Sequence, residues 1–167
     1  AVGGTARLGT LNIVTASNVT AGALTLGAFD QDAGTGTTTF GAAVNTNAGG
    51  GVVVANTALA VNAAVTTTNA GVVTLTQSAA TTIAAAGNIV SDGAVVITSG
   101  GGTTTSADIT TTNDLIQFAS ATALGDAVAL ISAGGAVTFS STLNNAQNLT
   151  ITAGSGAVTF AGAVGGG

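Results

Sequence analysis

Hydrophobic and polar residues alternate in short runs along this chain, and the runs recur at a fixed interval. The pentads Gly93–Ile97, Gly135–Phe139 and Gly156–Phe160 are apolar at their third and fifth positions. Related pentads begin at positions 50, 71 and 114, so the steps between successive copies are 21, 22, 21, 21 and 21 residues. A period of two is typical of β-strands, whose side chains alternate between two faces. The sequence therefore predicts stacked strands, one above another at intervals of about 21 residues.

A seven-residue period lies inside the longer one. Gly135–Ser141, Thr142–Asn148 and Leu149–Ser155 each read as a short strand followed by small or polar residues. A coiled coil is excluded, because 26 glycines and many Thr and Val residues would weaken a helix. The longer 22-residue step places one extra residue within Ala85–Asp92. We predict an all-β fold, a right-handed triangular parallel β-helix (β-solenoid) of roughly eight coils and about 38 Å length.

Stacked coils require residues one coil apart to match in character, and the sequence meets this requirement. The predicted structural core ladder consists of Val54, Leu75, Ile97, Phe118, Phe139 and Phe160. A neighbouring inward column consists of Val52, Val73, Val95, Ile116, Val137 and Val158, and a second side offers Ile109, Leu130 and Ile151. The outward column through Thr74 and Thr138 is mixed, as expected for a solvated face.

The chain is predicted to be a single solenoid segment over residues 1–167, less regular over residues 1–49. Phe29–Thr35 occupies a pentad position without resembling a pentad, which predicts a bulge or loop there. Asn56, Asn69, Asn113 and Asn148 end heptads, where Asn can adopt left-handed backbone angles or form a ladder.

Charge and composition restrict the chemistry. The net charge is −5, Arg7 is the sole Lys or Arg, and His, Cys and Tyr are absent. Nucleic-acid binding needs several cationic side chains, so we expect none. General acid–base and nucleophilic catalysis would have only carboxylates to use, so we expect no enzyme. Gly, Thr and Asn interrupt every apolar run, so no transmembrane segment is expected.

Carboxylates provide the candidates for a metal site. Asp92 and Asp114 flank the same predicted corner on consecutive coils, and Asp30 and Asp32 point to one side of a strand. Either pair could hold Ca²⁺ with backbone carbonyls. The competing interpretation is that they are solvated charges that keep the sheet edges soluble. No other cofactor is expected.

Threonine runs suggest a second kind of site. Thr37–Thr39, Thr66–Thr68, Thr103–Thr105 and Thr110–Thr112 would suit an ice-binding face if they formed constant columns. They fall instead on two different sides, and Thr is common at exposed strand positions in any case.

The string Asn148–Phe160, with its upstream relatives, resembles the repeats of large secreted bacterial exoproteins, namely filamentous-haemagglutinin-type adhesins and autotransporter passenger domains. The resemblance implies a β-helical stalk at the cell surface. We therefore expect an extracellular structural stalk or fibre segment. The alternative is an adhesin or binding module that recognises a glycan, ice or mineral surface through a flat face. Neither end resembles a cap, which predicts continuation into further coils or end-to-end self-association.

Overall fold

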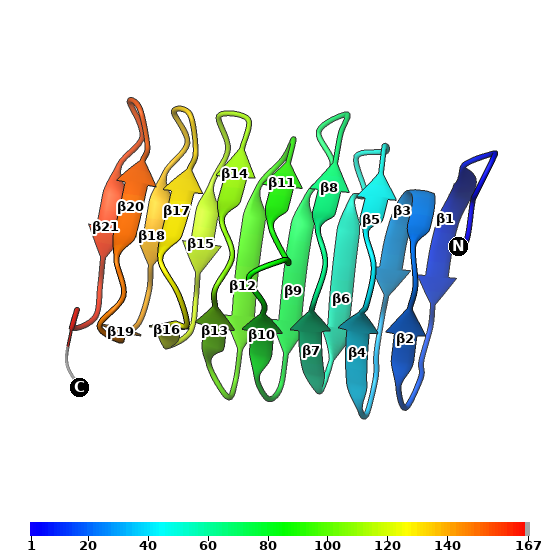
Figure 1. Ribbon diagram of the computed structural model, residues 1–167, viewed down its shortest axis with the longest axis horizontal. Coiled ribbons are helices and arrows are strands. Elements are labelled where there is room, and N and C mark those ends of the chain that lie inside the picture. Colours follow the sequence, from blue (N-terminus) through cyan, green and yellow to red (C-terminus); the bar gives the residue numbers. More distant parts are fainter. Residues whose placement is uncertain (166–167) are drawn as a thin grey trace.

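The chain winds as a parallel β-solenoid with about 21 residues per turn (Figure 1). A computed structural model describes residues 1–165. Every strand pair in it is parallel, and each turn adds one strand to each of three faces. The all-β, parallel and three-sided fold predicted from the sequence is thus confirmed, whereas the handedness of the winding stays a prediction.

The first face is a seven-stranded sheet. Its strands are β2 (Val19–Ala21), β4 (Thr37–Phe40), β7 (Ala58–Val61), β10 (Thr81–Ile83), β13 (Thr103–Thr105), β16 (Thr122–Leu124) and β19 (Leu143–Asn144). The second face contains β5 (Val44–Thr46), β8 (Val65–Thr67), β11 (Ile89–Ser91), β14 (Ile109–Thr111), β17 (Val128–Ile131) and β20 (Leu149–Thr152). The third face contains β6 (Val52–Asn56), β9 (Val73–Gln77), β12 (Val95–Ser99), β15 (Ile116–Phe118), β18 (Val137–Phe139) and β21 (Val158–Phe160).

One long strand joins the second and third faces at the N-terminal end. β3 (Leu24–Gln31) pairs with β5 through Leu24–Leu26 and with β6 through Phe29–Gln31, and β1 (Leu8–Ile13) lies along its other edge. The stack has about seven turns rather than the roughly eight predicted, because residues 1–18 contribute only β1 and isolated bridges. Seven turns spaced by about 4.8 Å give a rod about 34 Å long.

The predicted core ladder is present. Val54, Leu75 and Ile97 are paired in register, followed by Phe118, Phe139 and Phe160, and all but the last are buried. The rings of Phe118 and Phe139 stack with centroids 5.0 Å apart, and those of Phe139 and Phe160 with centroids 5.4 Å apart. The column through Val52 and Val137 and the column through Ile109, Leu130 and Ile151 also hold their predicted register.

The segment at Phe29–Thr35 differs from the prediction. Its first three residues are strand and pair with Val52, Val53 and Val54, so the loop begins only at Asp32. Phe29 is buried as a member of the column of Val52. Gln31 takes an inward position because its side-chain oxygen accepts a hydrogen bond of 2.6 Å from the hydroxyl of Thr38. The hydrogen bond allows a polar residue to occupy a core column.

The interruption predicted at Ala85–Asp92 is present but larger. Six residue steps separate Ile83 from Ile89, whereas four separate Val61 from Val65 and Thr105 from Ile109. The step between β8 and β11 is therefore 24 residues, and the next, between β11 and β14, is 20. The pentads of the third face regain their register because the next corner is two residues shorter, with four residue steps from Ser91 to Val95 against six from Thr67 to Val73.

Within residues 1–165, no helix is present that is long and apolar enough to cross a membrane.

Candidate functional site

Aspartate side chains lie mostly at the corners, and several of them accept hydrogen bonds from backbone amides. The carboxylate of Asp92 accepts a hydrogen bond of 2.8 Å from the N–H of Ala70, and that of Asp108 accepts one of 2.8 Å from Ala129. Both bonds join successive turns of the solenoid. Such contacts satisfy N–H groups that the strand ladders leave unpaired at a corner. Two of the six aspartates thus link successive turns, and the carboxylate of Asp126 accepts a hydrogen bond of 2.7 Å from the neighbouring N–H of Ala127.

The calcium candidates form two separate pairs. Asp92 and Asp114 lie at the corner between the second and third faces on consecutive turns, as predicted, and the backbone carbonyl of Asp114 accepts a hydrogen bond from Thr111. Asp30 is half-exposed on the outer side of β3, and Asp32 is exposed just beyond it. No group of three or more His, Cys, Asp or Glu residues comes together within residues 1–165. Calcium binding at either pair stays a prediction.

Columns of buried polar side chains lie on the inner side of two of the coil's three corners. The sequence pattern did not predict these columns. Between the third and first faces, the Thr81 hydroxyl donates to the Gln77 side-chain oxygen (2.7 Å) and lies 2.6 Å from the Ser99 hydroxyl, while Thr103 donates to Ser99 over 3.3 Å. All four side chains are buried.

The second polar column lies between the second and third faces. Thr67 and Ser91 are 3.0 Å apart, and both donate to the carbonyl of Gly71. Ser132 donates to the carbonyl of Gly135 in the same way two turns later. The remaining corner, between the first and second faces, is mainly apolar and includes Val61, Val65 and Ile83. The polar columns thus form part of the inner lining of the coil, beside the apolar columns.

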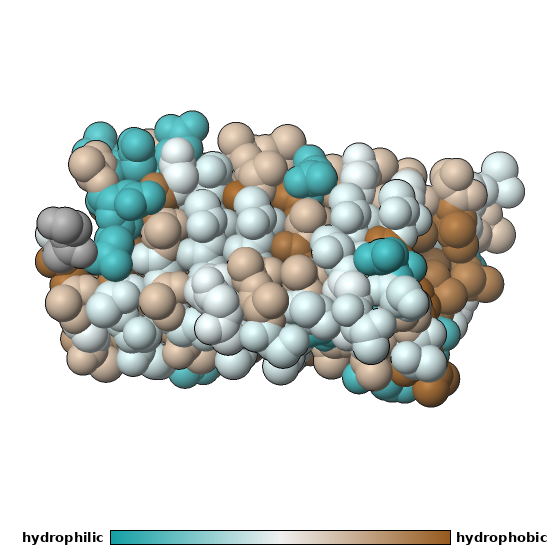
Figure 2. Space-filling model, turned by 90° about the horizontal axis from the view of Figure 1, so that it is seen from below, coloured by the Kyte–Doolittle hydropathy of each residue, from teal (hydrophilic) through white to brown (hydrophobic). Residues whose placement is uncertain are grey.

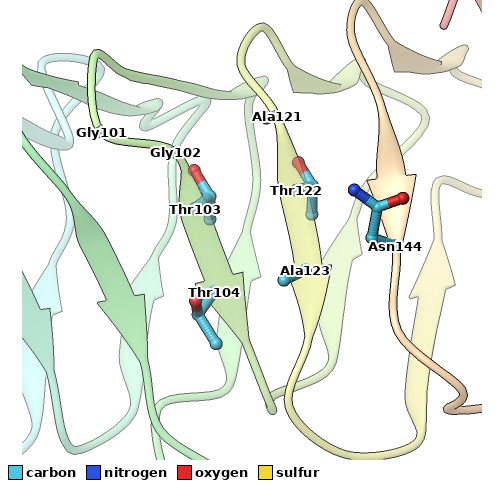
Figure 3. Close-up of a pocket in the computed structure, with 8 residues that line it drawn as sticks. All are labelled: Gly101, Gly102, Thr103, Thr104, Ala121, Thr122, Ala123 and Asn144. Carbon is cyan, nitrogen blue, oxygen red and sulfur yellow. The ribbon is translucent and has the colours of Figure 1, made fainter. Parts of the chain in front are cut away.

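Shallow hollows mark the outer surface. One, of about 170 Å³, lies on the first face over β13 and β16 (Figure 3). It is lined by Gly101, Gly102, Thr103, Thr104, Ala121, Thr122, Ala123 and Asn144. A second, of about 370 Å³, follows the corner between the third and first faces and includes Asp32 and Asn56. A third, of about 350 Å³, lies at the C-terminal end of the rod.

The outward column of the first face is small and uncharged but not constant. Its members in order are Thr20, Thr39, Ala60, Thr82, Thr104, Ala123 and Asn144. Figure 2 views the molecule from below, the side on which β4, β7 and β10 lie in Figure 1, and shows a mostly pale surface with a few teal patches. The threonine runs fall on the first and second faces, as predicted. A regular array of hydroxyl groups would need Thr at every turn.

Comparison with protein families, with curated proteins and with solved structures found no match. The chain combines a continuous hydrogen-bonded rod with a hollow of mostly small side chains on its first face and a largely apolar hollow at its C-terminal end.

Proposed function

We propose that this chain is a structural rod, a segment of a stalk or fibre in a secreted or cell-surface bacterial repeat protein, and that it carries no catalysis. The observation that supports the proposal is the continuity of the inner columns. Apolar and hydrogen-bonded side chains run in register through the stack and join every turn to the next. A solenoid of this kind transmits its stiffness from coil to coil, because each repeat contacts its neighbours.

Surface chemistry supports a spacer rather than a reactive centre. The carboxylates of Asp92 and Asp108 hold backbone amides, and the guanidinium of Arg7 donates to the carbonyls of Leu26 and Asn45. These charged groups fasten one turn to another. In the proposed setting outside the cell, a rod tied in this way presents few loose segments to proteases.

Two measurements on the purified chain test the rod. Small-angle X-ray scattering of the monomer should give an elongated particle about 34 Å along its axis. Proteinase K should remove terminal residues and leave the strands between β4 and β18 intact. Trypsin is uninformative here, because Arg7 is the only Lys or Arg. Rapid cleavage inside the strands, or scattering from a flexible chain, would show that the chain is no stiff spacer.

The location has its own test. Antibodies raised against the folded chain should label intact, unpermeabilised cells of the source organism. Labelling that requires permeabilisation would contradict an extracellular role and leave the rod geometry unaffected.

The alternative of a flat binding face has weaker support. The first face is uncharged along its outward column, which suits a neutral partner surface, but four threonines alternate irregularly with alanine and asparagine. Exposed aromatic side chains, which commonly anchor partners, are limited to Phe160 among residues 1–165.

A further inference from the structure

Large hydrophobic side chains are exposed chiefly at the two ends of the rod. Eight such side chains are exposed among residues 1–165, and six belong to the end turns, namely Val2, Leu8, Val14, Val158, Phe160 and Val164. Only Val90 and Ile131 lie on the side of the rod. Concentrated exposed apolar surface marks a site of association more reliably than scattered residues do.

The C-terminal end is an open section through the core. Leu149, Ile151, Phe160 and Val164 line its hollow of about 350 Å³. β20 and β21 are the last strands of their faces, and no strand among residues 1–165 pairs with their outer edges. Such an edge is a template for one more parallel strand.

The N-terminal end shows the same features. β1 lies outside β3, with Leu11 and Ile13 packed on the core but half-exposed, and Leu8 is 44% exposed. Figure 2 shows a brown, hydrophobic patch at the right-hand end, where Figure 1 places β1.

Each inward column of side chains runs from the N-terminal turn to the C-terminal turn, so the two ends of the rod expose the first and last members of the same columns. Val158 ends the column that begins with Leu11 and continues through Phe29 and Val52. Phe160 ends the column that begins with Ile13.

The other faces repeat this match. On the second face, Ile151 ends the column that Val2 begins through its bridge to Leu24. On the first face, Val164 bridges to Leu143 and so ends the column that Val19 begins. Apolar side chains therefore stand at both ends of all four columns.

We infer that copies of this 167-residue chain associate head to tail, with the C-terminal turn of one copy stacked on the N-terminal turn of the next. β21 then pairs in parallel with β1, and Val158 and Phe160 pack on Leu11 and Ile13 of the second copy. The inference rests on the proposed rod function and names its partner. Further coils in a longer chain would occupy the same two surfaces by the same contacts.

Head-to-tail stacking follows from the polarity of the strands. It continues the parallel ladder and the column order that already join consecutive turns within the chain. A head-to-head pair would set strands antiparallel and end each column after one junction. Because the two contacting surfaces differ, the contact leaves a free surface at each end and produces an open filament rather than a closed dimer.

Complementary variants test the inference. Leu8→Asp places a charge on the exposed edge of β1, the strand that carries Leu11 and Ile13, and Phe160→Asp places one on the C-terminal contact itself. Val90→Asp is the matched control, since Val90 is 48% exposed on the side of the rod and Phe160 is 43% exposed. Circular dichroism establishes that each variant folds, and Val158→Asp replaces Phe160→Asp if the latter does not. Sedimentation velocity over a wide concentration range then reports the mass.

The wild-type chain and Val90→Asp should grow in mass with concentration. Leu8→Asp and Phe160→Asp should each be monomeric alone, and their equimolar mixture should form a dimer and nothing larger. A wild-type chain that stays monomeric up to its solubility limit overturns the inference. Association of either end variant alone, or loss of association in Val90→Asp, overturns the head-to-tail contact. X-ray scattering from the monomeric Phe160→Asp variant still measures the shape of the rod. The proposed structural function is therefore tested independently of self-association.

Discussion

Phe139 lies in the middle of the aromatic stack, with Phe118 on one side and Phe160 on the other. Phe139→Asp would place a carboxylate among these rings with no partner, at a cost of several kcal/mol. The whole stability of a domain is only about 5–15 kcal/mol, so we expect loss of native strand content by circular dichroism. Phe139→Leu keeps the site apolar and should lower the free energy of unfolding by about 1–3 kcal/mol. Native folding of Phe139→Asp would mean that the column does not carry the core.

Ser132 tests the buried polar columns at the same scale. Its hydroxyl donates to the carbonyl of Gly135 and is fully buried. Ser132→Ala removes the donor and leaves that carbonyl one hydrogen bond short, which should cost about 1–3 kcal/mol in a urea titration. Ser78→Ala is the control, because Ser78 is exposed at another corner, and its effect should stay within about 0.5 kcal/mol. Equal effects of the two changes would show that the buried hydroxyl columns add nothing to stability.

At the scale of the structural element, the geometry of the corners determines how the strands of one turn stack on those of the next. Gly135 lies two residues before β18, and a Cβ there would lie 2.1 Å from the carbonyl oxygen of Asp114 in the preceding turn. Gly135→Ala should therefore push two turns apart and lower the melting temperature by several degrees. Gly22 also precedes a strand but has open space around it, so Gly22→Ala should leave the melting temperature unchanged or slightly raised. A Gly135→Ala chain as stable as wild type would contradict the close stacking at this corner.

The elements that the sequence predicted best are those in which a column has one character throughout. Every residue in the column that runs from Val52 to Val158, one per turn, is apolar. The register of this column could therefore be predicted from the spacing alone. The inner corners were not readable, because the buried Thr81 and Ser132 are the same residue types as the exposed Thr82 and Ser78.

Local contacts explain the other differences at this scale. Gln31 looked like the start of a loop because its burial depends on a hydrogen bond to Thr38, which spacing does not show. Asn69 and Asn113 do adopt left-handed angles, with φ of 57° and 69°. Ala70 and Ala133 adopt them as well, with φ of 59° and 54°, and nothing in their residue type predicted it. Corner geometry thus depends on the adjoining turn as much as on the residue itself.

At the scale of the whole molecule, the rod consists of similar turns stacked on one another. Removal of one complete turn should therefore give a shorter rod that still folds. Deletion of residues 116–136 removes β15, β16 and β17, which form one complete turn of 21 residues. Val95 then pairs with Val137, Ile97 with Phe139, and Ile109 with Ile151, so these three inward columns stay apolar.

Deletion of residues 116–125 provides the contrast, because it removes fewer residues but only part of a turn. The whole-turn variant should keep the wild-type circular dichroism spectrum and unfold cooperatively, with a smaller urea m-value since less surface is buried. The part-turn variant brings Asp126 to the place of Ile116, so a carboxylate enters an apolar column and the later strands lose their pairing. It should therefore lose strand content or aggregate, despite its greater length. If both deletions fold equally well, register between turns is not what holds the rod together. If neither folds, the turns are not interchangeable units.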